Sequence, residues 1–318
     1  MRIVIVDGYA LNPGDLNWET IQGMGETIIY DRTEVRDIVE RCKDADIVLT
    51  NKVPFTRETL LQLPCLKLIC VTATGYNIID TQAAREQGLV VTNIPAYSTQ
   101  SVAQTVIALL LSVTNRVEHY TNQITDEKQW SRNADFCYWD TQLTELADKR
   151  MGIYGFGRIG RQVSLIAQAL GMEVVVHTSK PQEELPEGIT KLTGDMFWET
   201  CDVISLHCPL TPETNNLVNE VTLQKMKSSC ILINTARGPL VNEAAIAEAL
   251  SHSRLKAFCA DVLSVEPASE DNPILQAPNV FLTPHIAWAT LEARQRLMNI
   301  LIANIRAFID GSPINVVN

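Results

Sequence analysis

The chain has 318 residues, of which 46% are hydrophobic and 20% charged, and its formal net charge is −11 at pH 7. This length and composition predict about two globular domains with sizeable cores. The acidic balance argues against a nucleic-acid partner, because phosphate binding needs clustered Lys and Arg and no basic block occurs. The longest apolar stretch, within 101–113, is too short for a bilayer span, and we expect neither a signal peptide nor a membrane partner.

Eight cysteines are spread along the chain without a C-x-x-C pair, and most of them lie in apolar runs. We therefore expect reduced thiols in the core rather than disulfides, and a cytoplasmic location. No group of residues indicates a metal site.

Strand-like runs alternate with helix-like segments in two series. The first series has five runs, at 2–7, 26–31, 45–51, 66–72 and 89–94. The second has about six, at 149–155, 173–178, 201–207, 230–236, 256–262 and 279–284. Such alternation predicts parallel sheets with crossover helices. The fold class we predict is α/β, with two doubly wound parallel-sheet lobes.

Two further segments connect or follow these lobes. Residues 99–120 indicate one long helix whose apolar residues nearly encircle it, which predicts burial between lobes or against another subunit. The loop that follows, 129–150, is rich in aromatic residues. Residues 289–311 indicate an amphipathic helix that we expect to pack back onto the first lobe.

The sequence GFGRIG (155–160) forms a G-x-G-x-x-G pattern between a strand-like run and a helix-like run, the order that a dinucleotide-binding turn requires. Gly155 permits a tight turn, Gly157 lets a pyrophosphate approach the backbone, and Gly160 permits close packing of helix on strand. The free N–H groups of the helix N-terminus then favour phosphate.

The loop after the next strand bears on which dinucleotide binds. An acid at that place would accept the ribose 2′-OH of NAD, but here the residues are Thr178, Ser179 and Lys180. Hydroxyl groups and a lysine favour tolerance of, or preference for, the 2′-phosphate of NADP. The alternative is that this loop is merely solvated and NAD binds through other contacts.

Three segments, 233–246, 258–267 and 281–294, follow strands of the second series and can converge at the carboxyl edge of its sheet. They contain Arg237, whose planar fork suits a carboxylate or keto oxygen, and Glu266 and His285. A carboxylate orients an imidazole, which then serves as general acid in hydride reduction and as base in the reverse direction. Spacing alone does not exclude His177 and His207 from this role.

Eight motifs together resemble the D-isomer-specific 2-hydroxyacid dehydrogenase family, and most of all its hydroxypyruvate reductase (D-glycerate dehydrogenase) branch. They are ATGYNIID (73–80), NIPAYSTQSVAQTVIALLL (93–111), DFCYWD (135–140), GFGRIG (155–160), SLHCPLTPETNNLV (205–218), INTARGPLVNE (233–243), ADVLSVEP (260–267) and TPHIAWAT (283–290). The resemblance implies a discontinuous, flavodoxin-like substrate-binding domain (1–98 and 287–318) and a Rossmann dinucleotide-binding domain (99–286), with a cleft between them. It also implies a homodimer built on residues 99–148.

The same resemblance implies roles for individual residues. Arg237, Glu266 and His285 form the catalytic trio, and the backbone around Thr74 and Gly75 holds the substrate carboxylate. Lys52 and Arg294 lie near the substrate or the rim of the site. The residues expected to bind the dinucleotide, besides the three glycines and the loop of Thr178, Ser179 and Lys180, are Thr105, Phe156, Arg158, Ile159, His207, Cys208, Pro209, Thr214, Thr235, Ala236, Asp261, His285 and Ala287. Trp139 is expected to pack in the core, and the alternative role that the resemblance implies is reaching a partner subunit's site.

The activity that we expect is reduction of hydroxypyruvate to D-glycerate, and of glyoxylate to glycolate, with NADH or NADPH. Another 2-hydroxyacid dehydrogenase, such as phosphoglycerate dehydrogenase, is the alternative within enzymes. A nucleotide-sensing, corepressor-like binding protein is the alternative outside them, because such relatives keep the catalytic trio.

Overall fold

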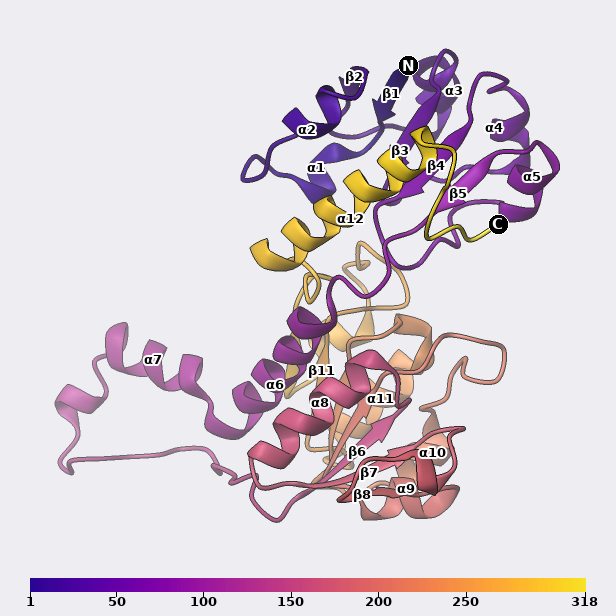
Figure 1. The fold of residues 1–318 in the computed structure, drawn as a ribbon. Coiled ribbons are helices and arrows are strands. Elements are labelled where there is room, and N and C mark those ends of the chain that lie inside the picture. The colour runs from indigo at the N-terminus through magenta and orange to yellow at the C-terminus, as the bar shows by residue number, and fades with distance from the viewer. The chain divides into compact units, whose positions relative to one another are not determined.

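The computed structural model describes all 318 residues. The chain divides into two compact units, residues 1–98 with 289–318 (unit 1) and residues 99–288 (unit 2), which are described separately (Figure 1). The chain leaves unit 2 after Trp288, whereas the sequence-based boundary is at residue 286.

Unit 1 contains a five-stranded sheet in the order β2-β1-β3-β4-β5, and every pair of neighbours is parallel. Its strands are β1 (Arg2–Ile5), β2 (Glu26–Ile29), β3 (Ile47–Thr50), β4 (Leu68–Val71) and β5 (Val90–Thr92). All five predicted strands are confirmed. The central strands β3 and β4 are buried at every position, as continuous apolar runs covered on both faces must be.

The helices of unit 1 are short, except for the last one. They are α1 (Gly8–Leu11), α2 (Glu19–Gln22), α3 (Ile38–Cys42), α4 (Arg57–Leu61), α5 (Thr81–Glu86) and α12 (Leu291–Ile309), with a 3₁₀ turn η1 (Val35–Asp37). The yellow ribbon in Figure 1 shows α12 beside the strands of unit 1, and it contacts β4. Its buried residues include Ala293, Leu297, Leu301 and Ile305, a stripe at helical spacing that faces the core.

Unit 2 contains a seven-stranded parallel sheet in the order β12-β11-β10-β9-β6-β7-β8. Its strands are β6 (Arg150–Tyr154), β7 (Glu173–His177), β8 (Ile189–Lys191), β9 (Val203–Leu206), β10 (Ile231–Asn234), β11 (Ala257–Ala260) and β12 (Val280–Leu282). Reading outward from β6, this is the dinucleotide-binding strand order, with its switch point between β6 and β9. The edge strand β8 was not predicted, because it has three residues and only Ile189 is buried.

Helices cover both faces of this sheet. The helices of unit 2 are α6 (Thr99–Asn115), α7 (Val117–Thr125), α8 (Arg158–Ala169), α9 (Asp195–Thr200), α10 (Glu220–Lys225) and α11 (Glu243–Ser251), with 3₁₀ turns η2 (Trp130–Arg132), η3 (Gln182–Glu184), η4 (Gly238–Leu240) and η5 (Pro273–Gln276). Of these, α7 contacts η2 and extends away from the sheet (Figure 1). The prediction of one helix over 99–120 is wrong. The helix stops at Asn115, since Arg116 adopts a left-handed conformation, and α7 follows it. Helix α6 packs on α8 and on β10, β11 and β12.

The segment after α7 is largely exposed. The prediction that Trp139 packs in the core is wrong, because this residue is 70% exposed. Phe136, in the same segment, is 89% exposed. The prediction of core thiols holds for six cysteines, but Cys65 and Cys137 are exposed; all eight are free. None of the helices is both long enough and apolar enough to cross a membrane.

Candidate active site

The glycine turn after β6 has the geometry that its pattern predicts. Gly155 has a φ of +99°, and a Cβ there would lie 2.6 Å from the backbone N of Cys208. A Cβ on Gly160 would lie 2.4 Å from the Gly155 carbonyl oxygen, so this residue lets α8 approach the strand. Gly157 is different, because a Cβ there would meet nothing within 4 Å. Two glycines therefore serve packing, and the third leaves open space at the N-terminus of α8.

These features fit a nicotinamide dinucleotide. The space beside Gly157 lies where the first N–H groups of α8 need an anionic partner. The Thr235 hydroxyl, at the carboxyl end of β10, is buried and has no hydrogen-bond partner within the protein. A buried polar group without a partner indicates a missing ligand or water. Gly157 follows β6 and Thr235 follows β10, so both lie at the carboxyl edge of the same parallel sheet.

The other residues predicted to bind the cofactor are distributed around this edge. Thr214 forms a hydrogen bond with the Pro209 carbonyl at 2.7 Å, which shapes the turn after β9. Asn234 accepts from the Ala236 amide at 3.1 Å and donates to the Arg237 carbonyl at 2.8 Å, which fixes the turn after β10. The buried members of the set are Phe156, Cys208, Thr235, Asp261 and Ala287. The remaining members are partly or fully exposed: Thr105, Arg158, Ile159, His207, Pro209, Thr214, Ala236 and His285.

The loop after β7 is stiffened by strand β8. The Thr178 hydroxyl accepts from the Lys180 amide at 3.3 Å, and Lys191 Nζ donates to the Lys180 carbonyl at 2.7 Å. Gln182 binds both Ile189 O and Lys191 N, at 2.8 and 2.7 Å. The fold therefore brings a second cation, Lys191, to the predicted 2′-phosphate loop, and no sequence pattern marked it.

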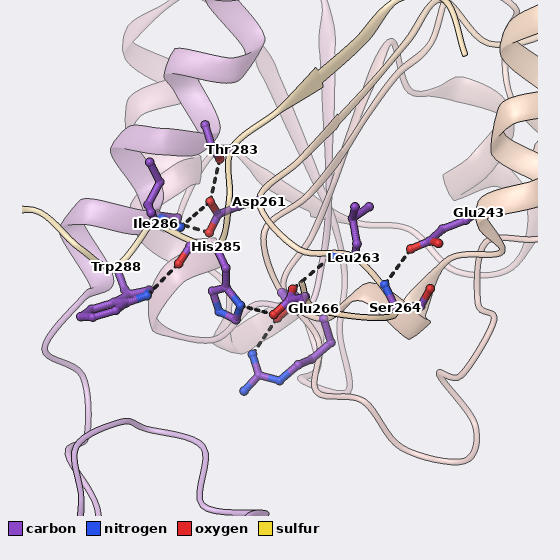
Figure 2. Close-up of polar contacts among 12 residues, drawn as sticks. Glu243, Asp261, Leu263, Ser264, Glu266, Thr283, His285, Ile286 and Trp288 are labelled. Atoms are coloured by element: carbon purple, nitrogen blue, oxygen red, sulfur yellow. Dashed lines mark hydrogen bonds and ion pairs between the residues drawn. The ribbon is translucent and has the colours of Figure 1, made fainter. Parts of the chain in front are cut away.

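Glu266 and His285 form the central polar contact of unit 2 (Figure 2). The Nδ1 atom of His285 lies 2.6 Å from Glu266 Oε2, and the other carboxylate oxygen accepts from the Leu263 amide at 3.1 Å. Both side chains are about one-third exposed, so solvent and small molecules reach them. Since Nδ1 faces the carboxylate, Nε2 is the nitrogen left for proton exchange.

Asp261 supports the turn that carries His285. Its carboxylate accepts from the Thr283 hydroxyl at 2.6 Å and from the amides of Ile286 and Ala287 at 2.8 and 2.9 Å (Figure 2). The residue is 2% exposed. These bonds hold the backbone on both sides of His285, whose own φ is +55°.

Arg237 follows β10 and is exposed. Its Nη1 donates to the neighbouring Ala236 carbonyl at 2.6 Å, and the guanidinium makes no ion pair. A guanidinium without a carboxylate partner is available for an anionic or keto-bearing ligand.

His177 and His207 are poor candidates for a general acid. His177 stacks on Tyr154, with ring centroids 4.3 Å apart, and burial lowers its pKa. Burial lowers the pKa of His207 to about 4, and its Nε2 lies 2.8 Å from Ser205 Oγ. Both rings therefore disfavour the protonated form, and of the three histidines only His285 is paired with a carboxylate.

In unit 1, the loop after β4 presents unbonded backbone amides. Thr74 Oγ1 donates to the Ile94 carbonyl at 2.8 Å, which fixes the loop, while the amides of Thr74 and Gly75 make no hydrogen bond within the protein. The loop after β3 is held by partly buried Asp7, which accepts from the amides of Asn51 and Lys52 at 2.8 and 2.7 Å. Burial raises the pKa of Asp7, and these backbone bonds oppose the rise.

Arg294, expected at the rim of the site, is 8% exposed. It donates to both carboxylate oxygens of Asp15, at 2.6 and 2.5 Å, and to the carbonyls of Leu11 and Ala289. In the structure its guanidinium therefore holds the loop after α1 to the start of α12, and a contact with substrate stays a prediction.

The strand order of unit 2, its glycine turn and the Glu–His pair define a dinucleotide-binding α/β protein. Residues 107–287 match the model of the D-isomer specific 2-hydroxyacid dehydrogenase NAD binding domain. The chain is 47% identical to the hydroxypyruvate reductase of Blautia hydrogenotrophica over 100% of both chains, and 42% identical to the glycerate dehydrogenase of Methylorubrum extorquens over 88% of each. It is similar to the structure of an acyclic imino acid reductase in complex with NADPH and D-Arg, with a TM-score of 0.84 at 30% identity over 100% of both chains. The chain belongs to the D-isomer specific 2-hydroxyacid dehydrogenase family, which confirms the resemblance.

Proposed function

We propose that the protein reduces hydroxypyruvate to D-glycerate, and glyoxylate to glycolate, with a nicotinamide cofactor. The observation that carries this proposal is the Glu266–His285 bond of 2.6 Å at the same sheet edge as the glycine turn. Two relatives that align with most of this chain are named for these acids, a hydroxypyruvate reductase and a glycerate dehydrogenase.

In this proposal each residue of the trio has one task. The cofactor, when bound, supplies the hydride that reduces a 2-oxo acid to a 2-hydroxy acid. His285 gives a proton from Nε2 to the keto oxygen, and Glu266 keeps the ring oriented through its bond to Nδ1. Arg237 offers two parallel N–H donors to the carboxylate or keto oxygen. For unit 1 we propose that the unbonded amides of Thr74 and Gly75 bind the carboxylate of the acid.

For the cofactor we propose that NADPH is accepted at least as well as NADH. The five residues that follow β7 include no carboxylate, since the first acid is Glu183, and they include Ser179 and Lys180. Lys191 of β8 is bonded to the Lys180 carbonyl and brings a second cation to this loop. Cations and hydroxyl donors stabilise a 2′-phosphate, whereas an acid at this place would repel it. The NADPH complex of the imino acid reductase is a precedent within the same fold.

The test is kcat/KM for hydroxypyruvate, glyoxylate, pyruvate and 3-phosphohydroxypyruvate, each with NADH and with NADPH, followed at 340 nm. We expect hydroxypyruvate to be the best substrate. Preference for the phosphorylated acid would favour phosphoglycerate dehydrogenase, and no turnover of any acid would contradict the proposal.

We also propose a cytoplasmic homodimer. The eight free cysteines fit a reducing compartment, and exposed Phe136 and Trp139 offer apolar surface for a second copy. Light scattering after size-exclusion chromatography tests the dimer. A monomer at micromolar concentration would contradict it, and Trp139→Ala should weaken the dimer.

A further inference from the structure

One carboxylate outside the trio, Glu243, holds the loop that contains Glu266 (Figure 2). Its Oε1 accepts from the Ser264 amide at 2.7 Å. Its Oε2 accepts from the Asn272 side-chain amide at 2.8 Å. Asn272 is 8% exposed, and its Oδ1 accepts from the Ile274 amide at 2.9 Å. Glu243 therefore connects two points of the chain that lie on either side of Glu266.

The bond to Ser264 is next to the bond that orients Glu266. Leu263 N donates to Glu266, and the following amide, Ser264 N, donates to Glu243. The two amides belong to successive peptide planes, which are rigid and share one Cα atom. A shift of Ser264 therefore also moves the Leu263 amide and the carboxylate that it holds.

Glu243 is itself held by the fold. It is the first residue of α11, which is capped by the Asn242 side chain at the Ala245 amide (3.1 Å) and is buried along one face. The segment just before α11 packs backbone to backbone on the same loop, because a Cβ on Gly238 would lie 2.0 Å from the Leu263 carbonyl group. Glu243 thus joins the segment that contains Arg237 to the loop that contains Glu266.

We propose that Glu243 is a positioning residue for the reduction and acts through Glu266 on His285. The inference rests on the proposed function in that it takes Glu266 and His285 as the proton-transfer pair. Without Glu243, the loop loses its bonds on both sides of Glu266, and the carboxylate is held less often against His285.

The first test is Glu243→Ala in the full-length enzyme. We expect kcat for hydroxypyruvate reduction to fall by about tenfold to a hundredfold, because small misplacements of reacting groups cost factors of this size. KM for the nicotinamide cofactor should stay unchanged.

Two further variants separate positioning from general destabilisation. Glu248→Ala is the matched control, because Glu248 lies on the same helix and its exposed carboxylate forms an ion pair with Arg254 only. The double variant E243Q/N272D reverses the bond between positions 243 and 272, because the side-chain amide at 243 then donates to the carboxylate at 272. The side-chain oxygen at position 243 still accepts from the Ser264 amide. We expect E243Q alone to lose activity, because its amide faces that of Asn272, and the double variant to recover most of it.

Hydrogen exchange followed by mass spectrometry gives a readout that does not depend on activity. Peptides covering residues 261–273 should exchange faster in E243A than in wild type, and at the wild-type rate in E248A. Unchanged exchange in this loop, an unchanged kcat in E243A, or an equal effect of E248A would overturn the inference. If wild type reduces no 2-oxo acid, the proposed function fails, and the exchange measurement still decides whether Glu243 holds the Glu266 loop.

Discussion

His285 and Glu266 are 2.6 Å apart although they come from different loops, one after β12 and one after β11. Glu266 is held by the Leu263 amide, and the turn that carries His285 is held by the carboxylate of Asp261. Two independent supports fix the ring with Nδ1 toward the carboxylate. This arrangement leaves Nε2 to exchange a proton with a substrate.

The first prediction concerns His285. His285→Ala should lower kcat/KM for hydroxypyruvate reduction by about a hundredfold to ten-thousandfold, the range for loss of a general acid. NADH binding, measured by nicotinamide fluorescence, should stay within about twofold of wild type. Turnover close to that of wild type would remove His285 from the mechanism.

The second prediction concerns the loop after β7. Lys180→Ala and Lys191→Ala should each lower kcat/KM with NADPH by about tenfold, the effect expected for one charge-assisted hydrogen bond to phosphate. Values with NADH should not change, because NADH has no 2′-phosphate. Lys225→Ala, which removes a surface ion pair with Asp195, is the control. An unchanged ratio of NADPH to NADH in both variants would show that this loop does not contact a phosphate.

The third prediction separates two glycines of one motif. A side chain on Gly157 enters open space, so Gly157→Val should keep the wild-type Tm but weaken dinucleotide binding by about tenfold or more. A Cβ on Gly160 collides with the Gly155 carbonyl, so Gly160→Ala should lower the free energy of unfolding by about 1–3 kcal/mol. Thermal denaturation and calorimetric titration with NADH measure the two effects, and equal losses of Tm would contradict the assignment.

The fourth prediction concerns pH and the ion pair in unit 1. The hydrogen bond from Arg294 lowers the pKa of Asp15 below its ordinary value of 3.8. A carboxyl group whose pKa is lower in the folded state contributes stability above 3.8, and this contribution is lost as the pH falls through the folded-state pKa. The Tm of Asp15→Asn should therefore be below that of wild type at pH 7, and the gap should close toward pH 2. Asp31→Asn, on a carboxylate without an ion pair, is the control, and a gap that does not depend on pH would contradict the prediction.

Several parts of the fold were predictable because they depend on local patterns. Eleven predicted strands are present, since buried parallel strands appear as apolar runs, and the glycine turn has a fixed spacing. Prediction failed where the local signal was weak. The edge strand at Ile189–Lys191 has one buried residue, and the break at Arg116 depends on a left-handed residue inside an otherwise helical pattern.

By itself, the sequence determined the fold class and the dinucleotide turn, because these follow from periodicity and spacing, and its motifs predicted Arg237, Glu266 and His285 as the catalytic trio. Only the tertiary structure decided which polar groups support them. In the sequence, nothing distinguishes Glu243 from other acids in the first turn of a helix, where acids are common. Likewise, nothing distinguishes Lys191 from other lysines on edge strands. Their partners, Ser264 and Lys180, lie 21 and 11 residues away along the chain. Such contacts arise only when helices and strands pack, because hydrogen bonds between distant loops depend on how the sheet brings their ends together.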